Sequence, residues 1–398
     1  MPATQRHAPA VVVPAIGAPS SVTVLRSLGP RGVHTIAASE RDSPPAFSSR
    51  HCDERVSVPD PTADMDAYAD ALLDLAARGD VRTIVPVREH DVYVLSTRRE
   101  EFAAHVATPW PTADQLEVAQ DRDRLFEVAA EAGVPAPETE LLGDVEDWDR
   151  KLIVKSRYAI VTGDQVESLS TPGTASISKT LFLDPGERPD IGALREQMHH
   201  DPIVQEYVDG PEYTVRVLAD HGEPVVTSIK RLVRGYKYSR GPSVCHEAVS
   251  NPTLEAQATT LLDALDWHGV ASVGFKQDTD TGEYKLMEIN PRFWANLPLD
   301  GHAGVDYPYY YWQLAADDID GVECEYAPGT ASHLLRGELV HLHSVCFEDY
   351  GFVEKPSLAS TVRDIAVSLS RQPNFDYLSL SDPGPFVRDT WNTVRSLV

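Results

Sequence analysis

The chain has 398 residues, of which 42% are apolar and 24% charged, a composition typical of a globular protein with two or three domains. Its net charge of −26 argues against binding nucleic acid through the phosphates, and no stretch is long and apolar enough to predict a membrane span. Only 8 of the 35 basic residues are lysine, and such an acidic, lysine-poor surface is typical of a halophile. The four cysteines form no CxxC pair, which indicates neither zinc nor disulfides and favours a cytoplasmic location.

Strands and helices alternate over residues 11–115. We expect strands at 11–13, 33–37 and 83–87 and helices at 21–28 and 64–78. Ser20 or Ser21 is the expected cap of the first helix. This βαβ order predicts a parallel sheet with helices on both faces. The first turn has one glycine and no GxGxxG pattern, which disfavours a dinucleotide site.

A second unit begins near residue 120, and its elements follow a different order. The expected elements are a helix at 121–131, a strand carrying Lys155, a Gly/Ser/Thr-rich loop at 161–178, a strand–turn–strand at 202–219, a strand entering a basic loop at 224–241, a helix at 253–265, and a hairpin of strands 270–276 and 284–290. After residue 317 we could assign no pattern.

The second hairpin strand carries polar side chains in an apolar run. Residues two apart in a strand share a face, so Glu288 and Asn290 should face one side while Met287 and Ile289 pack on the other. The proline that follows ends the strand and turns the chain toward Arg292. A carboxylate and an amide oxygen on a rigid strand are suitable ligands for Mg²⁺.

The run 288–294 (EINPRFW) and the elements before it resemble the ATP-grasp superfamily of carboxylate–amine and carboxylate–thiol ligases. The resemblance covers about residues 10–315 and is closest to the carbamoyl-phosphate-synthase-like branch and predicted carboligases. It implies an α/β and α+β fold. The implied domains are a Rossmann-like pre-ATP-grasp domain (1–115), a two-lobed ATP-grasp domain (116–317, small lobe about 116–205 and large lobe about 206–317), and a C-terminal extension of unknown role (318–398).

The resemblance also implies roles for residues near the phosphates. Glu288 and Asn290 would bind Mg²⁺ (or Mn²⁺) held by the phosphates of ATP, and Arg292 would contact those phosphates. Lys155 takes the place of a phosphate-binding lysine, although a serine replaces the usual proline beside it. Arg122 stands where many members have another phosphate-binding lysine, and an exposed helix residue is the alternative.

The segment 205–212 (QEYVDGPE) resembles the hinge between the two lobes. The backbone of Glu206 and Val208 would pair with adenine, and Gln205 would lie near its amino group. Glu212 would accept hydrogen bonds from the ribose hydroxyls, and a simple β-turn flanked by acids is the alternative.

Two loops complete the implied site. The loop 161–178 takes the place of a lid over the triphosphate, with Gly163 and Gly173 letting backbone N–H groups approach phosphate. In the basic run that follows, Arg231 and Arg234 would bind the substrate carboxylate and stabilise its acyl phosphate, because guanidinium forks suit such oxygens. The other cations considered there are Arg216, Lys230, Lys237 and Arg240. The alternative is a salt-bridged surface loop.

One position departs from the family pattern. If Asp278 faces Tyr284 in the hairpin, Gly274 falls opposite Glu288, where the family has a further acidic or amide metal ligand. Ser272 and Lys276 would share that face with the glycine, while the residues between them face the core. One metal ligand is therefore expected to be missing unless Asp278 replaces it.

The resemblance implies an ADP-forming ligase that uses ATP and Mg²⁺ to activate a carboxylate as an acyl phosphate and join it to an amine. Its partners would be these small molecules, with neither nucleic acid nor membrane; a homodimer is left open. The alternative, which Gly274 favours, is an ATP-binding protein of the same fold in a regulatory or scaffold role. Residues 88–91, after a strand end, would belong to the acceptor pocket. His341 and His343 are expected on one strand face.

Overall fold

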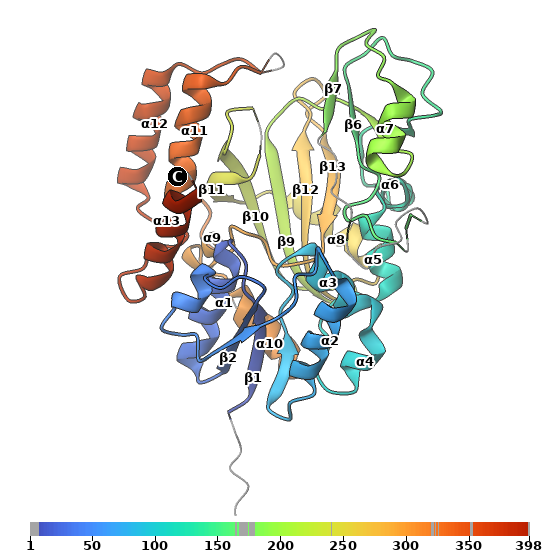
Figure 1. Cartoon of the computed structure of the whole chain (residues 1–398). Helices are drawn as coiled ribbons and strands as arrows, with labels where there is room; N and C mark the ends of the chain where they lie inside the picture. The colour runs from blue at the N-terminus through green and yellow to red at the C-terminus, as the bar shows by residue number, and fades with distance from the viewer. Residues whose placement is uncertain are drawn as a thin grey trace, which may run out of the picture.

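A computed structural model describes residues 8–163, 165, 166, 174, 180–239, 241–319, 322, 324, 326–350 and 353–396. In that part of the chain, no helix has both the length and the apolar character to cross a membrane. The elements form three sheets and a group of C-terminal helices (Figure 1). The mixture of one parallel and two antiparallel sheets confirms the predicted α/β and α+β class.

The N-terminal sheet is parallel, with the strand order β3-β2-β1-β4. Its strands are β1 (Ala10–Pro14), β2 (His34–Ser39), β3 (Glu54–Ser57) and β4 (Val81–Ile84), and its helices are α1 (Pro19–Leu28), η1 (Gly29–Arg31), η2 (Pro45–Ser48), α2 (Met65–Ala76), α3 (Glu89–Thr97) and α4 (Arg99–Ala103). Alternate residues of β1 enter different cores: Val11 packs with α1, and Val12 packs with α2. Helices therefore cover both faces, as predicted.

A small antiparallel sheet follows, with the order β5-β8-β6-β7. Its strands are β5 (Thr139–Leu141), β6 (Leu152–Lys155), β7 (Leu181–Leu183) and β8 (Ile203–Glu206), and its helices are α5 (Ala113–Gln120), α6 (Arg122–Glu131) and α7 (Ile191–Met198). Asp121 caps α6 by accepting a hydrogen bond from the Asp123 backbone N–H. The cap fixes the start of α6 at Arg122, the first predicted phosphate ligand.

The largest sheet has six strands in the order β13-β12-β9-β10-β11-β14. They are β9 (Glu212–Asp220), β10 (Glu223–Gly235), β11 (Ser243–Val249), β12 (Gly269–Gln277), β13 (Tyr284–Asn290) and β14 (Ala331–His333), and the associated helices are α8 (Pro252–Ala264), α9 (Pro298–His302) and α10 (Tyr307–Leu314). Phe293, Trp294 and Tyr311 pack into the same core as Val11 and Leu25. The large sheet and the N-terminal domain are therefore joined by a shared apolar core.

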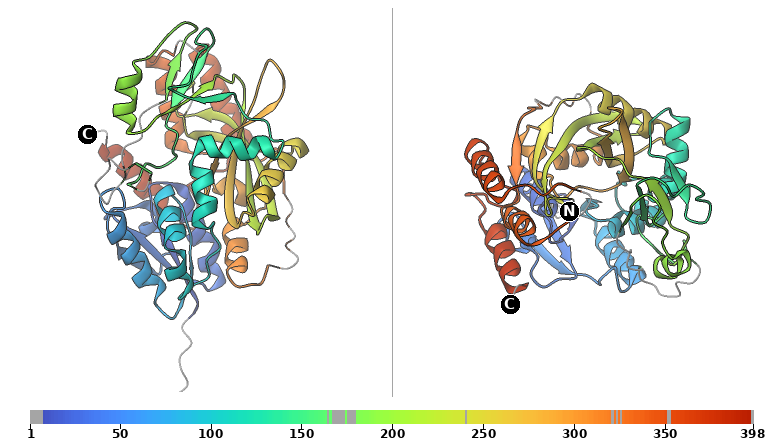
Figure 2. Two further views of the ribbon diagram at one scale, coloured as in Figure 1. Left: turned by 90° about the vertical axis from the view of Figure 1, so that its right-hand side faces the viewer. Right: turned by 90° about the horizontal axis from the view of Figure 1, so that it is seen from above.

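The residues after 334 form three helices: α11 (Leu335–Phe347), α12 (Leu358–Arg371) and α13 (Gly384–Ser396). Figure 2 shows them at one edge of the molecule, opposite the small lobe. β14 joins the extension to the large sheet by pairing with β11, and Arg26 of α1 binds Asp382 at 3.0 Å. The C-terminal extension therefore contacts both the large sheet and the N-terminal domain. The domain boundaries predicted near 115 and 317 stay predictions.

Three local predictions are wrong. α1 starts at Pro19 with Ala18 as its N-cap, so neither predicted serine caps it; the Ser21 hydroxyl instead donates to the Pro14 carbonyl at 2.7 Å. His341 and His343 lie on helix α11, not on a strand, so residues two apart do not share a face. The predicted basic loop is mostly strand, because β10 continues to Gly235 through its pairing with β11.

Candidate functional site

The hairpin β12–β13 places Glu288 opposite Gly274 and Asn290 opposite Ser272. This confirms the predicted register at Gly274, but Tyr284 pairs with Gln277 instead of Asp278. A bulge beside Gly274 absorbs the difference of one residue on β13.

The bulge changes which residues of β13 face the core. Leu286 and Ile289, three residues apart, are buried, while Met287 lines the same cavity as Glu288. The prediction that Met287 packs in the core is therefore wrong. Asp278 does not replace the missing ligand, because it lies in the turn and binds Lys285 at 3.1 Å.

Four predicted residues meet at the end of β13. Asn290 donates from Nδ2 to Glu288 Oε1 at 2.9 Å, and Arg292 donates from Nη2 to Asn290 Oδ1 at 3.1 Å. Arg122, from the start of α6, lies 3.5 Å from Glu288 Oε2. The side chain of Glu288 is 44% exposed and lines the cavity, so a ligand can reach it.

The charges around Glu288 keep it ionised. Loss of water around the group would raise its pKa, but Arg122, the hydrogen bond from Asn290, Lys155 and Arg292 outweigh that effect and lower the pKa. An ionised carboxylate surrounded by cations is an arrangement suited to a bound divalent ion and an anionic ligand.

Lys155, at the end of β6, lies near enough to Arg122 and Glu288 to interact with their charges. Among the described residues it has no recorded hydrogen-bond or ion-pair partner, and its nearest recorded contact is the Phe126 ring, with Nζ 5.8 Å from the centroid. Desolvation, together with the positive charges of Arg122 and Lys276, lowers its pKa to about 7 although Glu288 opposes the shift. The protein alone does little to stabilise the charged form of Lys155, so an anionic ligand would stabilise that form and bind to it.

The N-terminal domain adds a carboxylate to this cluster. Glu89, at the start of α3, lies 3.1 Å from Arg292 Nε, and its oxygens are buried without a hydrogen bond to any described residue. Burial raises the pKa of Glu89 even though Arg292 opposes the shift. Arg292 is therefore held between Asn290 of the large lobe and Glu89 of the N-terminal domain.

A cavity of about 630 Å³, the main cavity, opens in front of these residues. Three parts of the chain line it. The N-terminal loop contributes Gly17, Ala18 and Pro19, and the large sheet contributes, among others, Glu212, Lys230, Gly274, Lys276, Glu288 and Asn290. The C-terminal extension contributes Leu334, Arg336 and Asp376. The extension thus forms part of the wall, which the sequence did not predict.

A second pocket of about 410 Å³, the apolar pocket, shares Glu212, Lys276 and Met287 with the main cavity. Its apolar wall comprises Ile153, Phe182, Tyr207, Val208, Met287, Tyr350 and Val353. Lys276 Nζ donates to the Val208 carbonyl at 3.1 Å and lies 3.9 Å from Glu212 Oε1. Residues of the segment 205–212 therefore line both pockets, while their predicted role as a hinge that binds adenine stays a prediction.

The other hinge residues are held by neighbours of the small lobe and the hairpin. Gln205 is buried and donates from Nε2 to Thr139 Oγ1 at 2.9 Å, which leaves its Oε1 without a hydrogen bond in the described structure. Glu206 accepts from Lys285 at 2.6 Å. The Glu206 side chain is therefore occupied, and its backbone N–H is occupied as well, because it donates to the Glu138 carbonyl at 3.0 Å.

The two arginines predicted to bind a carboxylate are not brought to the main cavity. Arg231 is exposed and lies 2.5 Å from Glu247 on the neighbouring strand. Arg234 follows a register shift in β10 and binds Glu338 of α11 at 2.9 and 2.8 Å. Both arginines are paired with acids. Of the three basic residues, only Lys230 lines the main cavity: Arg231 is adjacent to it and faces the opposite side of the strand, and a register shift precedes Arg234.

Lys230 belongs to the basic run of the sequence and is the residue of that run whose side chain has a hydrogen bond near the cavity. Its Nζ donates to Ser243 Oγ at 2.8 Å, and desolvation and Arg216 lower its pKa to about 7 although nearby carboxylates, Glu212 first, oppose the shift. The alternation of residues along the strand was the signal that could have selected it over Arg231.

A third cavity of about 730 Å³, the lateral cavity, lies beside the main one and shares Ala18, Arg292 and Ala295 with it. Arg88, Glu89 and His90 line it, and their assignment to an acceptor pocket stays a prediction. His90 Nε2 lies 3.2 Å from Thr174 Oγ1 in the predicted lid. Gly173 of that lid and Arg240 of the basic run lie outside the described residues.

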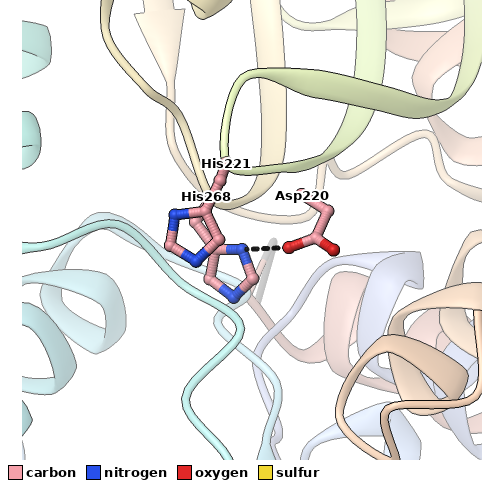
Figure 3. A group of neighbouring side chains, drawn as sticks. All are labelled: Asp220, His221 and His268. Carbon is pink, nitrogen blue, oxygen red and sulfur yellow. Dashed lines mark ion pairs between the residues drawn. The ribbon is translucent and has the colours of Figure 1, made fainter.

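Two further groups of potential metal ligands lie elsewhere. In Figure 3, the His221 ring stacks on His268, with centroids 4.4 Å apart, and His268 Nδ1 lies 3.2 Å from Asp220 Oδ1. Burial, together with His221, lowers the pKa of His268 to about 4. Asp220 is the last residue of β9 and Glu212 is the first, so about 26 Å of strand separates them at about 3.3 Å per residue. The group is therefore remote from the main cavity, which Glu212 lines.

The second group, Cys245, His333 and Glu338, is buried. Arg234 already neutralises Glu338, and burial raises the pKa of Cys245 to about 12, so the thiol stays protonated. This group is therefore a structural network that ties α11 to the large sheet.

The sequence is similar to known proteins over part of its length. A family described as "ATP-grasp in the biosynthetic pathway with Ter operon" matches residues 198–332. The D-aspartate ligase of Enterococcus faecium (strain Aus0004) is 23% identical over 218 residues, which are 50% of each chain, so this chain spans about half the length of that relative.

Solved structures show the same fold. The L-amino acid ligase from Bacillus licheniformis has a TM-score of 0.58 at 16% identity, with 82% of this chain and 79% of that chain covered. The biotin carboxylase domain of Hydrogenobacter thermophilus 2-oxoglutarate carboxylase, solved with MgADP, ADP and bicarbonate, has a TM-score of 0.60 at 18% identity, covering 80% and 71%.

Proposed function

Because this chain is an ATP-grasp protein, we propose that it is an ATP- and Mg²⁺-dependent ligase. It activates a small-molecule carboxylate as an acyl phosphate and joins it to an amine, releasing ADP and phosphate. The observation that carries the proposal is the convergence of Glu288 and Asn290 with the cations of Arg122, Lys155 and Arg292 beside an apolar pocket.

The apolar pocket takes the adenine. Its walls are largely apolar and aromatic, and Tyr207 and Val208 of the hinge line it, so the neighbouring backbone of Glu206 and Val208 pairs with the base. Glu212 lines both this pocket and the main cavity, which suits a residue that binds the ribose between base and phosphates. The three cations then hold the triphosphate.

Glu288 and Asn290 are the residues that would hold Mg²⁺. They fit because both present oxygen atoms next to the cavity and Glu288 is ionised. When bound, the ion supplies charge neutralisation at the phosphates. Gly274 offers no side chain opposite Glu288, so other oxygen atoms would have to complete the coordination.

The chemistry is a positioned phosphoryl transfer followed by acyl transfer. A carboxylate oxygen of the substrate attacks the γ-phosphorus, and the bond to ADP breaks. The amine then attacks the acyl carbon and loses a proton, and phosphate leaves with the original carboxylate oxygen. Lys155, Arg122 and Arg292 hold the transferring group, and Lys230 replaces Arg231 and Arg234 as the ligand of the carboxylate. The amine approaches from the lateral cavity.

A substrate screen tests the proposal. The protein is incubated with ATP, Mg²⁺ and pools of small acids and amines, including high-salt buffers, and products are read by mass spectrometry. We expect ADP and phosphate to form only when an acid is present. Glu288→Gln, which is nearly isosteric, serves as the inactive control.

The second candidate is an ATP-binding protein without turnover, which Gly274 favours because it removes a metal ligand. The same screen separates the two. Binding of ATP and Mg²⁺ by calorimetry, with no acid-dependent ADP from any pool, would favour this second function.

A further inference from the structure

The end of the main cavity away from Glu288 carries two charged groups that are only partly satisfied: Lys230 of β10 and Asp376 of the C-terminal extension. Arg336, the other charged residue of the extension on this wall, is already bound to Asp389 at 2.9 Å and to Tyr236 Oη at 2.8 Å. The unmatched charges of this wall are therefore one cation and one anion.

Asp376 is only 2% exposed, yet both of its recorded side-chain contacts use the same oxygen. Ser332 donates to Asp376 Oδ1 at 2.5 Å, and His246 Nε2 lies 3.4 Å from Oδ1. No contact from a described residue to Oδ2 is recorded, although the residue lines the cavity. A carboxylate oxygen that no described residue contacts, on a residue of the cavity wall, is available to a hydrogen-bond donor of a ligand.

Asp376 is charged in spite of this burial. Burial would raise its pKa, but His246 and the hydrogen bond from Ser332 outweigh burial and lower the pKa. An ionised carboxylate in the wall of a cavity attracts an ammonium group more strongly than a neutral donor.

Lys230 supplies the complementary charge. Ser243 Oγ is the only recorded partner of its Nζ among the described residues, so two of its three N–H donors remain for a ligand. Lys230 also lies between the metal-binding end of the cavity and Asp376 in the order of the sheet: Glu288 is on β13, Lys230 is on β10, and the residues that contact Asp376 are on β11 and β14.

We infer that the carboxylate substrate is an amino acid, whose carboxylate binds Lys230 and whose ammonium group binds Oδ2 of Asp376. The inference rests on the proposed ligase function and gives the C-terminal extension a role in substrate selection. The carboxylate then faces the phosphates held near Glu288, while the ammonium group is held away from them. The substrate's own amino group is thereby kept protonated and cannot attack its acyl phosphate.

Hydroxylamine trapping tests this inference without knowledge of the natural amine, because hydroxylamine converts an acyl phosphate to a hydroxamate. The protein is given ATP, Mg²⁺, hydroxylamine and pairs of acids that differ only in the amino group, such as aspartate and succinate, glutamate and glutarate, or alanine and propionate. D- and L-amino acids are tested separately.

For the wild type we expect hydroxamates from amino acids only. Asp376→Asn should lower kcat/KM for the amino acid by at least about thirtyfold, the loss expected for one buried charge pair, while the KM for ATP is unchanged. Asp382→Asn is the matched control, because it removes a buried carboxylate of the same extension that binds Arg26 and Ser49 and does not line the main cavity. It should lower stability without changing the preference for amino acids.

Equal use of both members of each acid pair by the wild type, or an unchanged preference in Asp376→Asn, would overturn the inference. If no acid yields a hydroxamate, the proposed function fails, and binding alone then decides. Amino acids, but not the deaminated acids, should raise the melting temperature of the wild type in the presence of Mg²⁺ and a non-hydrolysable ATP analogue. Equal effects of both acids would refute the ammonium site.

Discussion

Lys155 makes ATP affinity depend on pH, and the dependence follows from its surroundings. Its pKa in the free protein is lowered to about 7, mainly because it is desolvated and lies near Arg122. The phosphates of ATP would restore the charged form and raise that pKa toward the ordinary value of 10.5. Binding therefore takes up a proton wherever the free lysine is neutral, so affinity falls as pH rises above 7.

The magnitude follows from the fraction of free protein that carries the charge. With a pKa of about 7, that fraction falls from about 0.9 at pH 6 to about 0.1 at pH 8, so the Kd for ATP rises about tenfold over this range and about tenfold again by pH 9. At pH 8, binding should take up about 0.9 proton per ATP from this residue.

Calorimetry measures both quantities. The Kd for ATP–Mg²⁺ is determined from pH 6 to 9, and proton uptake is obtained at pH 8 from buffers with different ionisation enthalpies. Lys155→Arg is the control, since a guanidinium stays charged over this range, and its Kd should be nearly constant. A wild-type Kd that stays constant up to pH 9, with no proton uptake, would refute the contact between Lys155 and the phosphates.

Three further predictions concern other residues. Glu288→Gln should lower turnover by about 10²–10³-fold, and an unchanged dependence of activity on Mg²⁺ in this variant would exclude the metal role. Gly274→Glu should tighten Mg²⁺ binding, because its added Cβ would lie 3.4 Å from Glu288 Cγ and therefore fits. Lys230→Ala should raise the KM for the carboxylate substrate but not the KM for ATP. Arg234→Ala should lower the free energy of unfolding by about 3–5 kcal/mol, because it leaves the buried carboxylate of Glu338 unpaired. The opposite pattern, measured by steady-state kinetics and urea unfolding, would show that Arg234 and not Lys230 binds the substrate. The pKa of His268 is lowered from 6.5 to about 4, so the unfolded chain binds more protons than the folded chain between these pH values. The free energy of unfolding should therefore rise with pH across this range by up to about 3 kcal/mol. His268→Gln should make thermal stability less dependent on pH there, and an unchanged dependence would contradict the lowered pKa.

The sequence predicted the hairpin site because its signal is local. A two-residue period placed Glu288 and Asn290 on one face, and the pairing opposite Gly274 is confirmed. The bulge that turns Met287 to the cavity could not be predicted, because one extra residue leaves no distinct pattern in the sequence.

The roles of the basic residues depend on contacts between distant parts of the chain. Arg231 and Arg234 are bound by Glu247 and Glu338, and nothing local indicates these partners. Asp376 likewise reaches the main cavity only because β14 pairs with β11. The helices after residue 334, in contrast, did leave a signal, since apolar residues of α12 recur at 358, 362 and 365 with helical spacing.

The fate of the carboxylate oxygen is the most direct test of the proposed reaction. Amino acids labelled with ¹⁸O in the carboxylate are incubated with the protein, ATP, Mg²⁺ and an amine pool or hydroxylamine, and the released phosphate is analysed by mass spectrometry. An acyl phosphate intermediate predicts one ¹⁸O atom in the phosphate and none in ADP. Phosphate released without label, as from simple ATP hydrolysis, would contradict the account.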